Sequence, residues 1–234
     1  MKTIIFDGDD TLWKTQELYE NTKQIFIKIL QKNKIEDENT IKISNEIDLA
    51  RAKLLGYAKT RFIDSLLLTY TLLCGKYDKK WNIETEKEIR GLEKILFVKP
   101  ELYEDAIETL EALSKKFNLV LLTAGDKEIQ SKKLDFFDDT FISYFSKIYI
   151  VPRKDDEIIK AIIQQLKISP SDVWSIGNSI KSDINPWIKI GANAILILRK
   201  GWAYEDEELL FSNTLKSSSL KAIVNYISEG KNVY

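Results

Sequence analysis

Short apolar runs alternate with helical stretches from Pro100 onward, and this alternation limits the possible folds more than any other feature of the sequence. The runs contain many β-branched residues and read 119-LVLLT, 147-KIYIV, 173-VWSIG and 194-AILIL. A polar loop and a helical stretch follow each of them. Strands separated by helices form parallel pairs, and the opening strand Thr3–Phe6 would join the same sheet. The pattern predicts an α/β fold with a doubly wound, Rossmann-like parallel sheet.

The segment from Thr15 to about Leu96 shows helical spacing almost throughout. Its apolar residues recur three and four positions apart in three stripes, the second ending before Gly56 and the third before Gly75. Such stripes are typical of amphipathic helices that pack against one another. We therefore predict an all-helical domain over residues 14–97, inserted into a core made of residues 1–13 and 98–234.

Charge and composition exclude several classes of protein. The chain has 35 basic and 36 acidic residues, so it lacks the positive surplus that binds nucleic acid or anionic membranes. No apolar run reaches the ~18 residues of a membrane span, and Met1-Lys2 leads directly into a strand instead of a signal peptide. We expect a cytoplasmic monomer or homodimer that binds neither nucleic acid nor membrane.

The chain has no histidine and one cysteine, Cys74. This excludes Ser-His-Asp and Cys-His catalysis, histidine-ligated metals and an internal disulfide. Acid–base chemistry must therefore rely on carboxylates and lysines.

Three carboxylates, Asp7, Asp9 and Asp10, lie within four residues directly behind the opening strand. Like charges at short distance raise one another's pKa, so a fold keeps them together mainly when a cation, a proton or backbone donors compensate. A solvated turn is the simpler alternative, since Asp and Gly are common turn formers. Ligands of doubly wound sheets gather at the carboxyl ends of the strands. The other strand ends carry residues suited to phosphate or a divalent cation, namely Thr123-Ala124-Gly125, Lys154, Gly177-Asn178-Ser179 and Asp183.

These motifs, in this order, resemble those of the haloacid dehalogenase-like hydrolase superfamily: Asp7-x-Asp9-x-Thr11-Leu12, Thr123, Lys154 and Gly177-Asn178-Ser179-x-x-x-Asp183. The resemblance covers essentially the full chain. The helical insert is similar to the cap domain that many members carry between the first two motifs. The resemblance implies an Mg²⁺-dependent hydrolase that forms an aspartyl-phosphate.

The resemblance also implies roles for individual residues. Asp7 would be the nucleophile and Asp9 the general acid and base, while Thr123 and Lys154 would hold the phosphoryl oxygens. Crowding by Asp7 and Asp10 favours the protonated form of Asp9 that the first step needs. The substrate would contact Gly8, Asp9, Thr123, Ala124, Gly125 and Lys154. The Mg²⁺ ligands would be Asp7, the main-chain carbonyl of Asp9, Asn178 and Asp183.

Asn178 departs from the family's pattern, in which the fourth motif begins Gly-Asp. An amide oxygen still binds Mg²⁺, but with one negative charge fewer, so we expect weaker metal binding. Asn178 could instead cap the helix that follows, which leaves open whether Asn178 or Asp183 is the direct ligand.

The family catalyses several reactions, and Asp9 separates most of them. Dehalogenases and phosphonatases lack an acid at this position, so Asp9 favours cleavage of a P–O bond in a small phosphorylated metabolite. In the fourth motif, Asn178 makes the sequence more like that of a dehalogenase, which weakly favours dehalogenation as the alternative. A phosphonatase-type hydrolase, a phosphomutase and a phosphate-binding protein without turnover are further alternatives.

Overall fold

The computed structural model describes residues 2–199, 208–212 and 214–228. The chain forms two compact units, one made of Met1–Gln16 with Pro100–Tyr234 and the other of Glu17–Lys99. We call them the core unit and the helical unit. From the sequence we place the boundaries after residues 13 and 97, and that assignment of domains stays a prediction.

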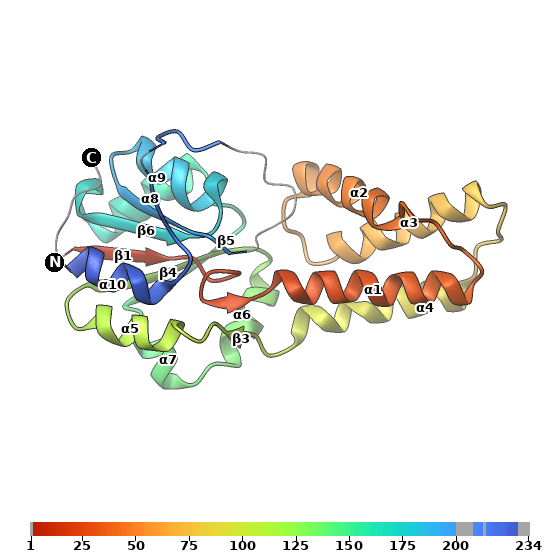
Figure 1. The fold of residues 1–234 in the computed structure, drawn as a ribbon, viewed down its shortest axis with the longest axis horizontal. Coiled ribbons are helices and arrows are strands. Elements are labelled where there is room, and N and C mark those ends of the chain that lie inside the picture. Colours follow the sequence, from red (N-terminus) through yellow and green to blue (C-terminus); the bar gives the residue numbers. More distant parts are fainter. Residues whose placement is uncertain (1, 200–207, 213, 229–234) are drawn as a thin grey trace. The chain divides into compact units, whose positions relative to one another are not determined.

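A parallel sheet lies at the centre of the core unit (Figure 1). Within the described residues it has six strands in the order β5-β4-β1-β6-β7-β8, and every neighbouring pair is parallel. Chain order reverses at β1, because β4 pairs with one side of it and β6 with the other. This confirms the predicted doubly wound α/β fold and brings the carboxyl ends of the strands to one edge. The strands are β1 (Thr3–Phe6), β4 (Asn118–Ala124), β5 (Lys147–Val151), β6 (Val173–Gly177), β7 (Asn193–Ile197) and β8 (Leu215–Ser217).

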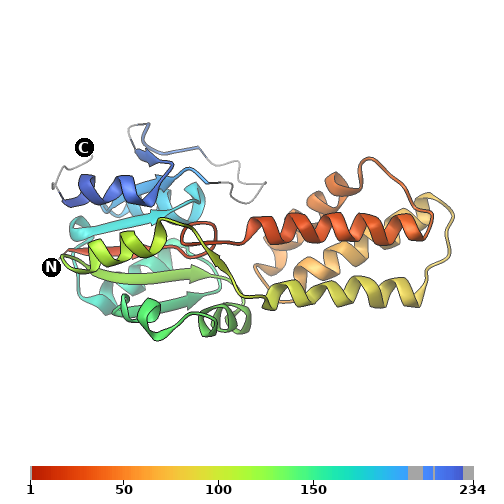
Figure 2. The same ribbon diagram turned by 60° about the horizontal axis from the view of Figure 1, so that its bottom comes forward.

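Helices cover both faces of the sheet (Figures 1 and 2). Side chains alternate along β1, so Ile4 and Phe6 point to one face and Ile5 to the other. Burying side chains of this size stabilises a fold by about 1.5–3 kcal/mol each. The two apolar layers therefore hold β1, and the loop after it, in a fixed place. Ile4 and Phe6 share their core with α5 (Ala106–Ser114), α7 (Asp139–Ser143) and α10 (Leu220–Ser228), and Ile5 shares its core with α8 (Asp156–Leu166) and α9 (Asn185–Lys189).

We did not predict β8, nor the antiparallel ribbon of β2 (Trp13–Lys14) and β3 (Glu101–Leu102). These strands have two or three residues, too few to show an alternating pattern. In the ribbon, Lys14 Nζ lies 2.6 Å from Glu101 Oε1. The ribbon joins the two chain segments by which the core unit connects to the helical unit.

Two short segments lead away from the carboxyl edge of the sheet. Helix α6 (Lys127–Asp135) follows β4 and is capped by Asp126, whose side chain accepts from the backbone N–H groups of Glu128 (3.0 Å) and Ile129 (3.2 Å). After β6 the chain forms a π-helical turn, η3 (Ile180–Ile184), ahead of α9. Both segments carry residues of the candidate site.

The helical unit consists of helices whose apolar faces pack into one core that includes Phe26, Leu66 and Tyr70. As predicted, α2 ends before Gly56. Helix α3 continues through Gly75 to Lys76, so our prediction that Gly75 ends it is wrong. A glycine inside a helix costs only about 1 kcal/mol, which the packed face of α3 outweighs. The elements are α1 (Gln16–Lys32), α2 (Thr40–Leu55), α3 (Arg61–Lys76), α4 (Ile83–Arg90) and the 3₁₀ segment η1 (Gly91–Phe97).

Polar side chains are also buried inside the helical unit. Asp48 and Arg61 form a buried ion pair, and the Ser65 hydroxyl donates to Asp48 Oδ1 at 2.9 Å. The Lys23 ammonium donates to Asn45 Oδ1 at 2.6 Å, and burial lowers the pKa of Lys23. Across the described segments, no helix combines the length and the apolar character needed to cross a bilayer.

Candidate active site

Three predicted site residues meet at the carboxyl edge of the sheet. Asp7 follows β1, Lys154 follows β5, and Asp183 lies in η3 after β6. The Lys154 ammonium nitrogen is 2.5 Å from Asp7 Oδ1 and 2.6 Å from Asp183 Oδ1. All three side chains are buried, which excludes a solvated turn after β1. We call Asp7, Lys154 and Asp183 the bridged carboxylate pair.

Burial and charge together set the protonation of the bridged carboxylate pair. Burial is the main reason that the pKa of Asp7 is raised to about 7; Lys154 opposes the rise, and the negative charge of Asp183 adds to it. Burial by itself would lower the pKa of Lys154, but the carboxylates of Asp183 and Asp7 raise it above its ordinary value. Lys154 is therefore a cation at neutral pH, and a further positive charge near Asp7 would favour the ionised form of Asp7.

The fourth motif holds Asp183 in place. Asp183 Oδ2 accepts a hydrogen bond from the Ser179 N–H at 3.1 Å, and the main-chain carbonyl of Asp183 accepts one from the Ser175 hydroxyl at 2.7 Å. Ser175 belongs to β6 and Ser179 follows it. The carboxylate is thus fixed by the strand and by the turn that leaves it.

Asn178, in the fourth motif, contacts the loop between β1 and β2, residues 7–12, which we call the first loop. Its Oδ1 accepts a hydrogen bond from the Thr11 hydroxyl at 3.4 Å. The turn that follows is capped by Ser179, whose hydroxyl accepts from the Ser182 N–H at 3.0 Å. The capping role that we considered for Asn178 therefore belongs to Ser179, and metal binding by Asn178 stays a prediction.

The end of β4 presents a buried hydroxyl. Thr123 is fully buried, and its Oγ1 has no hydrogen-bond partner among the residues that the structure describes. Such an atom is uncommon in a native fold and is suited to a ligand oxygen. The backbone after Thr123 is hydrogen-bonded within the protein. The Ala124 carbonyl accepts from Gln130 Nε2 (3.2 Å), and the Gly125 N–H donates to the Val151 carbonyl (2.8 Å). Substrate contacts by Ala124 and Gly125 stay predictions.

Asp9 has a different set of partners from Asp7. Its Oδ1 accepts from the Trp13 indole N–H, the Thr15 hydroxyl and the Lys133 ammonium, each at 2.6 Å. Its Oδ2 accepts from Gln130 Nε2 at 2.7 Å. We call these four donors the Asp9 clamp. The clamp joins the first loop to α6.

The clamp decides the protonation of Asp9. Burial by itself would raise the pKa of Asp9, but the Lys133 charge and the hydrogen bonds of the clamp lower it below its ordinary value. Our prediction that crowding by Asp7 and Asp10 keeps Asp9 protonated is therefore wrong. The donors outweigh the repulsion between the carboxylates.

The Trp13 ring supports the first loop. It is fully buried, and its centroid lies 5.3 Å from that of Phe137 and 6.4 Å from that of Phe141. Gly8 lies against this ring, since an added Cβ would be 2.3 Å from two indole carbons. The glycine thus allows the close approach that puts the indole N–H at Asp9. Contact of Gly8 with substrate stays a prediction.

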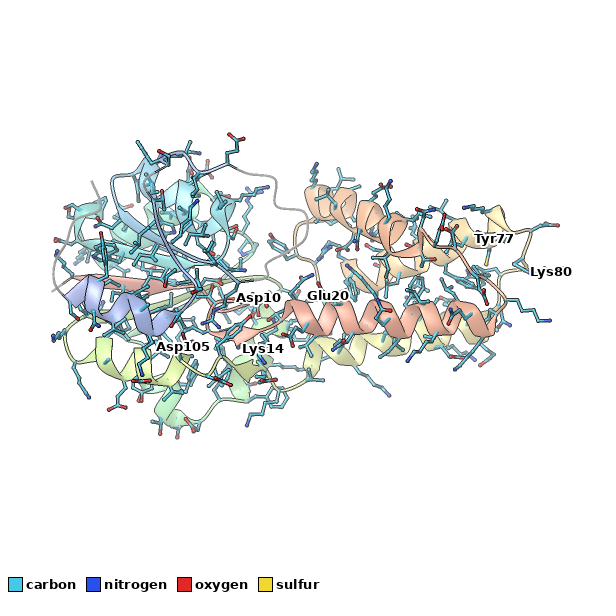
Figure 3. All side chains as sticks on the ribbon, viewed as in Figure 1. Asp10, Lys14, Glu20, Tyr77, Lys80 and Asp105 are labelled. Atoms are coloured by element: carbon cyan, nitrogen blue, oxygen red, sulfur yellow. The ribbon has the colours of Figure 1, made fainter. Side chains whose placement is uncertain are left out.

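Asp10, labelled in Figure 3, organises the chain that leads into α1. Its Oδ1 accepts from the backbone N–H groups of Thr15 (2.8 Å) and Gln16 (2.9 Å). Burial raises the pKa of Asp10 to about 6. Asp10 therefore has a structural role, because its carboxylate accepts hydrogen bonds from these backbone N–H groups.

The residues of the Asp9 clamp were not predicted. A buried tryptophan needs an acceptor for its N–H, so Trp13 carried a signal that we did not use. Gln130 and Lys133 carried none, because polar residues three positions apart on a helix are mostly solvated. Their contact with Asp9 depends on where α6 lies, which periodicity alone does not specify.

Comparison with known proteins agrees with this geometry. Residues 1–186 match the family model of haloacid dehalogenase-like hydrolases. No curated protein sequence matches the chain.

Solved structures show the same fold. A haloacid dehalogenase-like hydrolase from Xanthomonas campestris is 21% identical with a TM-score of 0.78, covering 98% of this chain and 91% of that one. L-2-haloacid dehalogenase from Xanthobacter autotrophicus with chloropropionic acid covalently bound is 14% identical, with a TM-score of 0.66 and coverage of 97% and 98%. A phosphatase of the same superfamily from Thermococcus onnurineus is 20% identical, with a TM-score of 0.61 and coverage of 97% and 98%. Both reactions thus occur on this fold.

Gly8→Ala should destabilise the protein, because the added methyl group must displace a buried ring. Overpacking of this kind costs roughly 1–3 kcal/mol. Thermal unfolding followed by circular dichroism measures the effect. Gly75→Ala is the control, since an added Cβ there meets nothing within 4 Å and should leave the melting temperature unchanged or raise it. An equally stable Gly8→Ala protein would show that the Trp13 ring does not constrain the loop.

Proposed function

Because the chain belongs to the haloacid dehalogenase-like hydrolase family, we propose that it is an Mg²⁺-dependent phosphatase that hydrolyses a small phosphomonoester through an aspartyl-phosphate. The Asp9 clamp carries this proposal. It fixes a carboxyl group two residues after Asp7. Breaking a P–O bond to an alcohol needs a proton donor, whereas a halide leaves without a proton. A phosphatase therefore has a use for the clamp, and a dehalogenase has none.

The reaction would run in two displacements. In the first, an Asp7 carboxylate oxygen attacks phosphorus, the bond from phosphorus to the ester oxygen breaks, and Asp9 protonates that oxygen. In the second, water attacks the phosphorus of the aspartyl-phosphate while Asp9 takes a proton from the water, and Asp7 returns as a carboxylate. Lys154 and the Thr123 hydroxyl would hold the phosphoryl oxygens on which charge develops.

The opposite pKa shifts of Asp7 and Asp9 suit different parts of this cycle. The lowered pKa of Asp9 suits the second step, which needs a carboxylate base. The first step needs the acid form, so Asp9 must gain a proton on one oxygen before it donates, while the other oxygen can still accept hydrogen bonds from the clamp. Asp7 must be ionised to attack, and a pKa of about 7 leaves it partly protonated at neutral pH. A cation beside Asp7 would lower the pKa of Asp7 and so increase its ionised fraction.

The oxygen donors of the site fit a magnesium ion. Mg²⁺ prefers oxygen ligands, uses one or two carboxylates and keeps several waters. Within the described ranges, no three acidic, histidine or cysteine side chains form a cluster that could hold a metal. Amide and carbonyl oxygens are therefore needed beside the carboxylates, and Asp7, Asp183, Asn178 and the main-chain carbonyl of Asp9 would supply them. Bound Mg²⁺ would neutralise charge on the phosphoryl group and favour ionised Asp7.

A dehalogenase is the second candidate, and the bridged carboxylate pair favours it. Lys154 already supplies a positive charge to both Asp7 and Asp183, so a fraction of Asp7 is ionised at neutral pH without a metal. Asn178 also offers a metal one negative charge fewer than the Asp of the family's pattern. In that reaction Asp7 would displace halide from carbon, and Asp9 would have no proton to transfer.

The purified protein should release phosphate from small phosphomonoesters in the presence of Mg²⁺, and EDTA should abolish the release. The measurement uses sugar phosphates, nucleotides and nitrophenyl phosphate, with halide release from a 2-haloacid assayed in parallel. Halide release that survives EDTA, with no phosphate released from any ester, would contradict the phosphatase proposal and support the second candidate.

Substitution of the two carboxylates should separate their roles. Asp7→Asn should abolish turnover and weaken binding of a beryllium fluoride phosphate mimic, because a nucleophile and a metal ligand are lost together. Asp9→Asn should still bind the mimic but lose roughly 10²- to 10⁴-fold in kcat, the usual contribution of a general acid or base. The loss should be greatest for alkyl phosphates, whose leaving groups need a proton. Near-normal hydrolysis of alkyl phosphates by Asp9→Asn would rule out this role.

Asn178→Asp should lower the Mg²⁺ concentration that gives half-maximal activity, because a carboxylate binds Mg²⁺ more strongly than an amide. Asp183→Asn should raise that concentration. Titration of activity with Mg²⁺ at fixed substrate measures both effects. An unchanged Mg²⁺ dependence in Asn178→Asp would remove Asn178 from the set of ligands without affecting the phosphatase proposal.

A further inference from the structure

Helix α6 brings two buried side chains to Asp9. Gln130 Nε2 lies 2.7 Å from Asp9 Oδ2, and the Lys133 ammonium nitrogen lies 2.6 Å from Asp9 Oδ1. Only 3% of Gln130 and 6% of Lys133 are exposed. We propose that Gln130 and Lys133 are positioning residues, which hold the two oxygens of Asp9 in the orientation that proton transfer requires. This inference rests on the proposed phosphatase function.

The two donors on α6 differ from the other two donors of the clamp in their distance from Asp9 along the sequence. Trp13 and Thr15 lie four and six residues after Asp9, in β2 and directly after it, so their contacts with Asp9 are local in the sequence. Gln130 and Lys133 are 121 and 124 residues away in the sequence. Within the clamp, they are the donors that fix the first loop relative to β4, at whose end the phosphoryl group would bind.

Helix α6 is itself firmly attached. Asp126 caps its first turn, and the buried Ile129 anchors it. The Gln130 amide also donates to the Ala124 carbonyl at 3.2 Å, and an added Cβ at Gly125 would be 2.7 Å from Gln130 Nε2. The amide therefore has little room to turn away from Asp9.

Stability alone does not explain why Lys133 is buried. Removing a lysine from water costs several kcal/mol, and a buried ion pair is often no more stabilising than apolar residues of similar size. An apolar residue at this position of α6 would avoid that cost. The pair with Asp9 is explained if the reaction needs this carboxylate in one orientation.

Lys133→Met should lower kcat by roughly 10- to 100-fold, as expected when a catalytic group loses its support or is slightly misplaced. KM and the Mg²⁺ dependence should stay close to those of the wild type, because Lys154, Thr123 and Asn178 are untouched. The loss should be larger for an alkyl phosphate than for nitrophenyl phosphate, since nitrophenolate leaves without a proton.

Two further variants of α6 keep the test independent of any single substitution. Gln130→Met removes the support of the other Asp9 oxygen and should act in the same direction. Lys133→Arg keeps the charge and should recover much of the rate. Lys132→Met is the matched control, because Lys132 is half exposed, pairs with Glu128 at 3.1 Å and should be replaceable without kinetic effect.

A double-mutant cycle with Asp9→Asn separates positioning from general damage. If Lys133 acts through Asp9, Lys133→Met should cause almost no further loss in the Asp9→Asn background. Equal losses in both backgrounds, or normal turnover of alkyl phosphates by Lys133→Met and Gln130→Met, would overturn the inference. A wild-type protein that hydrolyses only a haloacid would instead overturn the proposed function, and the inference about Gln130 and Lys133 with it, because Asp9 has no proton to transfer in that reaction.

Discussion

The contact of Lys154 with both Asp7 and Asp183 is the interaction on which the rest of the site depends. These side chains follow three different strands, β1, β5 and β6, and all three are buried. Without the ammonium group, two neighbouring carboxylates would be buried with no counter-charge, and breaking a buried pair of this kind typically costs about 3–5 kcal/mol. The sheet must therefore hold the three side chains close enough for Lys154 to contact both carboxylates. The topology does so, because β5, β4, β1 and β6 are neighbouring parallel strands whose carboxyl ends lie at one edge of the sheet.

Asp7 and Asp9 are two residues apart, yet their environments shift their pKa values in opposite directions. Burial raises the pKa of Asp7, whereas Lys133 and the other donors of the clamp lower that of Asp9. Neighbouring carboxyl groups with separated pKa values are a common way to obtain two chemical roles from one residue type. In a phosphatase these roles would be nucleophile and proton carrier. Asp10 has neither role, since the backbone before α1 occupies its side chain.

The aromatic side chains of the core unit help to keep the pKa values of Asp7 and Asp9 apart. Trp13 packs against Phe137 and Phe141 and donates its N–H to Asp9, so one residue joins the apolar core to the polar loop. Gly8 leaves room for the ring. The first loop therefore has its conformation set by packing on one side and by hydrogen bonds on the other, which leaves little freedom for the carboxylates that it carries.

The sequence by itself determined the α/β class, the parallel strands after Pro100, the helical insert, and the identity of the residues at the strand ends. These follow from local periodicity and from the rule that parallel strands share one functional edge, so Asp7, Thr123, Lys154 and Asp183 could be named in advance. The tertiary structure decided what those residues contact. It gave the cap of η3 to Ser179 instead of Asn178, and it left Asp9 ionised through Lys133 and Gln130. The sequence could not show this, because a pKa depends on neighbours in space, and the decisive neighbours of Asp9 lie more than 120 residues along the chain.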